Sequence, residues 1–320
     1  MTVPPPNPDT CTSIGQIVDY NGIPVVCTIE GTLYGYYPSL GANAFFAAFF
    51  GLCFVVQLVL GIRYKTWTYM IALSLGCIGE TVGYAGRVIM NNDPFAEVGF
   101  MTQICCLIIS PAFVAAGIYI TLKHVVISFG DSWSRLRPAW YTYIFICGDL
   151  ISLALQGAGG GLASAGDPGS SAQDIGTNLM IAGVIFQVVV LVFFGYFLAE
   201  YAIRTHRRRE QLSAESMRLF NSTSFRCFMF AVGVAYMGIL IRCVYRIPEL
   251  TGGWRSELMR NEIEFIVLEG VMIVISVGAL TVFHPGYCFP ALGNTIGKNK
   301  KVRRGKSVDD NSDMEMVAGR

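Results

Sequence analysis

The stretch WTYMIALSLGCIGETVGYAGRVIM (residues 67–90) decides the fold, because it is long and apolar and yet carries an acid and an arginine. A helix needs roughly 20 mainly apolar residues to cross the hydrocarbon of a bilayer, so this length predicts a membrane span. Glu80, Tyr84 and Arg87 follow one another at i, i+4 and i+7, which places them on one helical face. A charge in lipid costs about 3 kcal/mol on insertion scales, so we expect this face to point into a helix bundle or a wet cavity.

Composition extends this prediction to the whole chain. Of 320 residues, 53% are hydrophobic and 14% are charged, and the mean hydropathy is +0.51, which is typical of an integral membrane protein. No alternating ten-residue pattern recurs, so a β-barrel is not favoured. The predicted fold is an all-α, seven-transmembrane-helix bundle. Its spans are predicted at about 40–62, 67–90, 99–122, 140–158, 177–201, 225–245 and 264–283.

The distribution of Lys and Arg predicts the orientation. Cytoplasmic loops of membrane proteins carry an excess of these residues, and here they concentrate in loops one, three and five and in the C-terminal tail, whereas residues 1–37 contain none. The mixed charges of loop six give the weakest indication. We therefore expect an extracellular N-terminal segment (1–37), a seven-helix domain (38–290) and a cytoplasmic disordered tail (291–320). The basic positions used are Arg63, Lys65, Lys123, Arg135, Arg137, Arg204, Arg207, Arg208, Arg209, Arg218, Lys298, Lys300, Lys301, Arg303, Arg304 and Lys306.

This topology predicts the state of two cysteines and of one glycosylation sequon. Cys11 and Cys27 fall in the predicted outside segment, where a disulfide persists; two free thiols are the alternative. The sequon at Asn221 falls in basic loop five, so we expect it to be unglycosylated.

Further polar residues lie inside the other spans. Asp149, Ser152 and Gln156 are spaced i, i+3 and i+7, and a second stripe runs from Arg242 to Glu249. Intramembrane ionisable residues are functional candidates by default, although a purely structural network is the alternative. Gly79, Gly83 and Gly86 predict close approach of another helix. The candidate site residues are Glu80, Tyr84, Arg87, Tyr119, Asp149, Gln156, Gln187, Arg242, Arg246, Glu249 and Glu269.

Sequence patterns for an enzyme or an ATP-driven motor are absent. The segment GNTIGKNK (293–300) lacks the glycine spacing of a phosphate-binding loop. His124, His206 and His284 have no metal-ligand spacing to one another or to a cysteine pair. We therefore predict no catalytic residue, no cofactor and no metal, and the net charge of +1 gives no reason to expect a nucleic-acid partner.

Six ordered motifs resemble the fungal RTA-like family of lipid-translocating exporters. They are GETVGYAGR (79–87), SPAFVAAGIYITL (110–122), CGDLISLALQGAGGG (147–161), GVIFQ (183–187), RCVYRIPELTGGW (242–254) and FHPG (283–286). The resemblance covers about residues 34–290. Two departures are Asn261-Glu262, where many relatives have His-Glu, and Glu269, where many have Asp.

The resemblance implies a seven-span protein of the plasma membrane or, alternatively, of vacuolar or other endomembranes. Family members are linked to the translocation of sphingoid long-chain bases, to amino-sterol resistance and to porphyrin traffic. We therefore expect membrane lipids as partners, with acids binding a cationic head, arginines holding those acids ionised or contacting a lipid phosphate, and tyrosines and glutamines supplying neutral hydrogen bonds. The alternatives are a seven-helix receptor-like sensor, or a regulator of lipid asymmetry that transports nothing itself. The sequence indicates no particular protein partner.

Overall fold

The computed structural model describes residues 11–20, 23–32, 34–129, 138–165, 170–207, 214–252 and 257–289. The predicted disordered tail at 291–320 lies outside these residues, as do the loop positions Arg135, Arg137, Arg208 and Arg209.

Helices occupy every predicted span. The long helices are α1 (Leu40–Tyr64), α2 (Trp67–Asn92), α3 (Glu97–Phe129), α4 (Pro138–Ala165), α5 (Ser171–Arg207) and α7 (Thr223–Thr251). The last predicted span is built from α8 (Glu262–Glu264), the π-helical stretch η4 (Phe265–Val271) and α9 (Met272–Val282). Two short helices, α6 (Ala214–Asn221) and α10 (Pro285–Cys288), complete the set.

Six of the helical segments in the described part of the chain are long and apolar enough to cross a membrane. This confirms the prediction of a helical integral membrane protein. Helix α2 is not among the six, although it is 26 residues long and packs against both α1 and α3. The seven-span count and the orientation of the termini therefore stay predictions.

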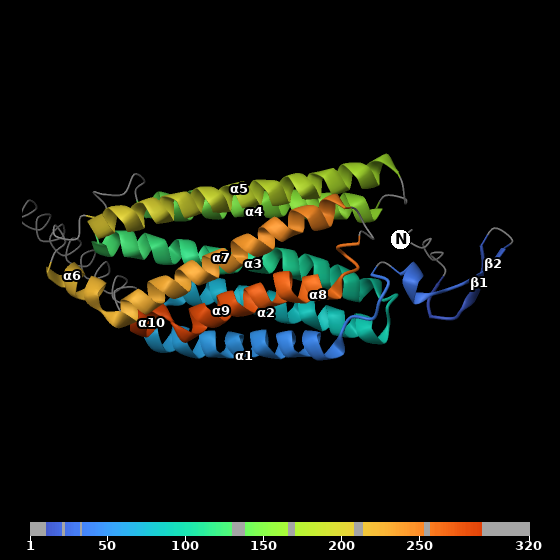
Figure 1. The fold of residues 1–320 in the computed structure, drawn as a ribbon, viewed down its shortest axis with the longest axis horizontal. Coiled ribbons are helices and arrows are strands. Elements are labelled where there is room, and N and C mark those ends of the chain that lie inside the picture. The colour runs from blue at the N-terminus through green and yellow to red at the C-terminus, as the bar shows by residue number, and fades with distance from the viewer. Residues whose placement is uncertain are drawn as a thin grey trace, which may run out of the picture.

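The long helices lie side by side along the long axis of the molecule (Figure 1). Neighbours in the chain contact one another from α1 to α5, α5 contacts α7, and α7 contacts α9, which returns to α1. Helix α3 also contacts α7 across the middle of this ring. Residues from helices distant in sequence therefore meet in the interior.

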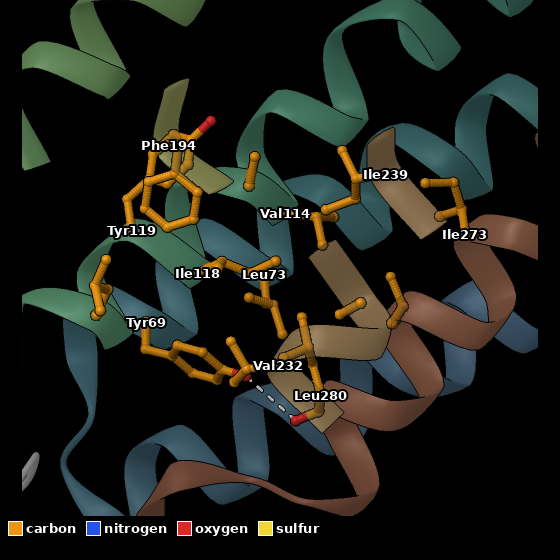
Figure 2. Packing of buried hydrophobic residues seen from close by; sticks show 14 of the residues in the cluster. Tyr69, Leu73, Val114, Ile118, Tyr119, Phe194, Val232, Ile239, Ile273 and Leu280 are labelled. Atoms are coloured by element: carbon orange, nitrogen blue, oxygen red, sulfur yellow. Dashed lines mark hydrogen bonds between the residues drawn. The ribbon is translucent and has the colours of Figure 1, made fainter. Parts of the chain in front are cut away.

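An apolar core fills much of that interior. Figure 2 shows Leu73 and Val114 packed near Val232 and Ile239, with the Tyr69 hydroxyl directed at the Leu280 carbonyl. That hydroxyl donates a hydrogen bond to the carbonyl oxygen at 3.2 Å. Large apolar side chains such as Phe230 are exposed on the bundle, as expected where the solvent is lipid.

Glycines bring α2 and α3 together, as the sequence predicted. A Cβ atom added at Gly86 would lie 2.8 Å from the backbone oxygen of Gly99, and one added at Gly83 would lie 2.6 Å from Leu107 Cδ2. Real Cβ atoms do not approach other atoms so closely, and the Gly99 oxygen is a backbone atom that cannot turn aside, so at Gly86 only glycine permits this helix spacing.

The N-terminal segment contains a hairpin that the sequence analysis did not predict. Strand β1 (Ile17–Tyr20) pairs antiparallel with β2 (Ile23–Val26), and a 3₁₀ turn, η1 (Ile29–Gly31), follows. A disulfide joins Cys11 to Cys27. Figure 1 shows the hairpin beyond one end of the bundle and α6 and α10 near the other. We call the first of these the hairpin end.

Candidate functional site

Arg242 is the centre of the buried polar interior. Its Nη1 donates to Glu80 Oε1 of α2 at 2.8 Å, and its Nη2 donates to Glu269 Oε1 of η4 at 2.8 Å. Arg242, Glu80 and Glu269 are all at most 1% exposed. This one guanidinium therefore ties α7 to α2 and to the last span.

A backbone group completes the coordination of Arg242. Its Nη2 also donates to the Leu107 carbonyl oxygen of α3 at 2.6 Å. Pro111 lies inside α3, four residues later. Because proline has no N–H, it leaves the carbonyl four residues earlier without its helical donor. Leu107 was not among the predicted site residues, and the proline in the motif SPAF was the signal that pointed to it.

Arg246 extends the network by one turn of α7. Its Nη1 donates to Glu249 Oε2 at 3.1 Å, and its Nη2 bonds to the same Glu269 oxygen that Arg242 uses. Glu269 lies in the seven-residue π-helical stretch, a local geometry that is frequent at functional sites. We call the five residues Glu80, Arg242, Arg246, Glu249 and Glu269 the ion network.

Arg87 does not join the ion network through a direct contact, although it shares a face of α2 with Glu80. Its Nη2 donates to the Tyr36 hydroxyl at 3.0 Å. Its guanidinium carbon lies 3.9 Å from the ring centroid of Phe265 and 5.3 Å from that of Tyr34. Burial raises the pKa of the Tyr36 phenol above its ordinary value, so this hydroxyl stays protonated near neutral pH.

Tyr84 lies between Glu80 and Arg87 along α2. Its ring stacks on Phe50 with an interplanar angle of 7°, and its hydroxyl has no hydrogen-bond partner among the described residues. A Cβ added at Gly270 would lie 3.2 Å from that hydroxyl. Tyr84 therefore borders the π-helical stretch without bonding to the ion network.

Asp149 belongs to a second polar group, on α3, α4 and α5. Its Oδ2 accepts a hydrogen bond from the Tyr119 hydroxyl at 3.0 Å. The residue is 3% exposed, its Oδ1 has no hydrogen-bond partner in the described part of the chain, and no described cation forms an ion pair with it. Ser152 does not contribute to this carboxyl, because its hydroxyl bonds to the backbone oxygen of Asp149.

Gln156 and Gln187 bond to each other and face the ion network across a small cavity. Gln156 Nε2 donates to Gln187 Oε1 at 3.1 Å, linking α4 to α5. A cavity of about 20 Å³ lies between this pair and the two arginines, which is room for about one water molecule. Its lining residues are Leu107, Ile108, Pro111, Gln156, Val184, Gln187, Arg242, Cys243 and Arg246.

The interior of the bundle combines charged side chains and neutral hydrogen-bonding groups with apolar surroundings. Within the described ranges, no group of three or more His, Cys, Asp or Glu residues is placed to hold a metal ion. Arginines bind all three acids of the ion network, although Glu80 Oε2 and Glu269 Oε2 have no hydrogen-bond partner among the described residues. Asp149 differs from them because no described arginine or lysine pairs with it, and its Oδ1 is also without a partner there. An interior of this kind suits an amphipathic ligand with a polar head.

A family comparison covers most of the bundle. The family described as "RTA1 like protein" matches residues 73–292, which include α2 from Leu73 onward and every residue of the ion network. The chain belongs to the RTA1-like family. This confirms the resemblance seen in the six motifs, and the site described above is an RTA1-like interior.

Three relatives of this RTA1-like chain are proteins of Saccharomyces cerevisiae. The chain is 29% identical over 295 residues to "Sphingoid long-chain base transporter RSB1", covering 83% of this chain and 77% of the relative. It is 30% identical over 213 residues to "Protoporphyrin uptake protein 1", covering 65% of each chain. It is 28% identical over 260 residues to "Protein RTM1", covering 78% of this chain and 79% of the relative. No solved structure matches this chain.

Proposed function

We propose that this RTA1-like protein moves an amphipathic lipid, such as a sphingoid long-chain base, across the membrane or out of the cell. Such a molecule joins a cationic amine and hydroxyl groups to a long apolar tail. The similarity to a sphingoid base transporter over 83% of the chain supports the class of substrate. The plasma membrane is the proposed location.

Asp149 is the observation that carries this proposal. An ionised carboxylate without a counter-charge is costly in an apolar interior, and the described residues provide Asp149 with only one neutral donor, Tyr119. An amine head would supply both the missing charge and a donor for Oδ1. Glu80, Glu249 and Glu269 are weaker candidates for the head, because arginines already bind them.

The neighbouring neutral groups fit the rest of such a head. Gln156 lies two turns from Asp149 on α4 and reaches Gln187 on α5. The two side-chain amides can donate to and accept from hydroxyl groups. The ion network then serves as the structural support that holds α2, α7 and the last span around this position.

Transbilayer movement in liposomes that contain only the purified protein tests the proposal. We expect wild-type protein to move a fluorescent sphingoid base between leaflets, and Asp149→Asn to slow this movement about tenfold or more, since a charge-assisted hydrogen bond contributes about 1.5–3 kcal/mol. Asp174→Asn is the matched control. It makes the same substitution at an exposed position at the start of α5.

Two results would contradict the proposal. Wild-type liposomes that move no lipid would favour the receptor-like or regulatory alternative. An Asp149→Asn protein that is well folded and transports at the wild-type rate would remove the head-group role of this acid while leaving transport itself in place.

A further inference from the structure

We propose that Arg87 forms a phosphate-binding site at the hairpin end of the bundle, closed by Tyr34 and Tyr36 of the N-terminal segment. The site takes the phosphate of a lipid head group or free phosphate. It is separate from the amine position proposed at Asp149 and does not depend on it.

The hydrogen bonding of Arg87 is incomplete. The residue is 0% exposed, and its Nε and Nη1 atoms have no hydrogen-bond partner among the described residues. Only Nη2 is bonded, to the neutral Tyr36 hydroxyl. An arginine carries five N–H donors in a fixed geometry, and three of them belong to the two atoms without partners. Buried donors are normally satisfied.

The charge of the ion network does not remove this requirement. The network holds three carboxylates and two guanidiniums, so its excess acid can offset the charge of Arg87 at a distance. Hydrogen-bond donors, in contrast, are satisfied only by an acceptor within about 3 Å. A phosphate oxygen is the acceptor that a guanidinium binds best, because the bonds are charge-assisted.

Residues of the N-terminal segment cover the Arg87 side chain. The Tyr34 ring faces the guanidinium, and the Tyr34 hydroxyl is held by Gln103 Nε2 at 2.9 Å. The next residues are anchored by Asn91, whose Nδ2 donates to the Pro38 oxygen at 2.8 Å. The segment from Tyr34 to Pro38 therefore closes the end of the bundle over Arg87. Tyr36 occupies one donor that a phosphate would otherwise use.

Thermal unfolding of the purified full-length protein in dodecyl maltoside, a detergent without phosphate, tests the site. The probes are dihexanoyl phosphatidic acid and inorganic phosphate, with dihexanoylglycerol and sodium chloride at equal ionic strength as blanks. We expect the phosphatidic acid to raise the wild-type melting temperature in a saturable way. Arg87→Gln should raise its apparent Kd about tenfold or more, which corresponds to about 1.4 kcal/mol.

Two tyrosine variants sharpen the test. Tyr36→Phe frees Nη2 and should lower the apparent Kd severalfold. Tyr37→Phe is the matched control, because Tyr37 is 47% exposed, and it should leave the Kd unchanged. A response to the lipid alone would support a site reached from the membrane, and a response to both probes one reached from water.

The proposal fails if neither probe changes the wild-type melting temperature beyond the blanks, or if Arg87→Gln responds as the wild type does. If Arg87→Gln does not fold, Tyr36→Phe decides: an apparent Kd equal to or above that of the wild type overturns the site. Asp149→Asn should bind the probes as the wild type does, whether or not it transports lipid, so the two proposals fail independently.

Discussion

At the scale of single residues, Arg242 joins α7 to three other helical segments. It contacts α2, α3 and the last span at once. A buried ion pair often adds little net stability, but removing one partner leaves the other charge uncompensated, which costs about 3–5 kcal/mol. Arg242 is therefore expected to be structural in the first place, whereas Asp149, which has no ion-pair partner among the described residues, is expected to be functional.

Arg242→Met tests the structural role. The change keeps a long side chain but leaves Glu80 without its cation and Glu269 with Arg246 alone, so we expect a loss of about 3–5 kcal/mol in stability and reduced expression. Arg226→Met is the control, since Arg226 is exposed on the same helix, and we expect a change within about 0.5 kcal/mol. Thermal unfolding in detergent measures both. Equal melting temperatures for the two variants would show that the ion network does not support the fold.

At the scale of elements, the spacing of α2 and α3 depends on Gly86. Its neighbour across the interface is the backbone oxygen of Gly99, which cannot rotate away as a side chain could. Any added atom must therefore push one helix away from the other, and the shift would be transmitted to Glu80 and Arg87 on the same helix.

Gly86→Ala should accordingly destabilise the protein by about 1–3 kcal/mol. Gly157→Ala is the matched control, because a Cβ at this helical position in α4 meets nothing within 4 Å. There we expect a gain of up to about 1 kcal/mol from the better helix propensity. The difference in melting temperature between the two variants is the measurement. A Gly86→Ala protein as stable as Gly157→Ala would contradict the close approach.

At the scale of the whole molecule, the orientation in the membrane is open to a direct test. We expect the natural sequon at Asn221 to carry no glycan in a eukaryotic host, and a sequon created at Asn21 by Ile23→Thr to be modified. Digestion with an endoglycosidase, followed by gel mobility, reads out both positions. Modification of Asn221 but not of Asn21 would reverse the predicted topology.

Much of this architecture could be predicted from the sequence, because a bilayer imposes a minimum length of apolar helix. Polar stripes could be found for the same reason, since a charge inside such a helix is conspicuous. Contacts between helices could not be predicted: Arg242 and Glu80 are 162 residues apart, and helical spacing alone suggested a closer relation between Glu80 and Arg87. The hairpin was also missed, although the dipeptide Asn21-Gly22 between apolar residues is a known hairpin signal.

The separation of Glu80 from Arg242 has a consequence for biosynthesis. A ribosome adds about 5–20 residues per second, so the 162 residues between the two partners take on the order of 10–30 s to make. During that interval α2, which is not among the helices apolar enough to cross by composition, holds its acid without the cation that neutralises it. If α2 spans the membrane as predicted, we therefore expect its stable integration to await translation of α7, and a nascent chain that stalls before residue 242 to leave Glu80 without its cation.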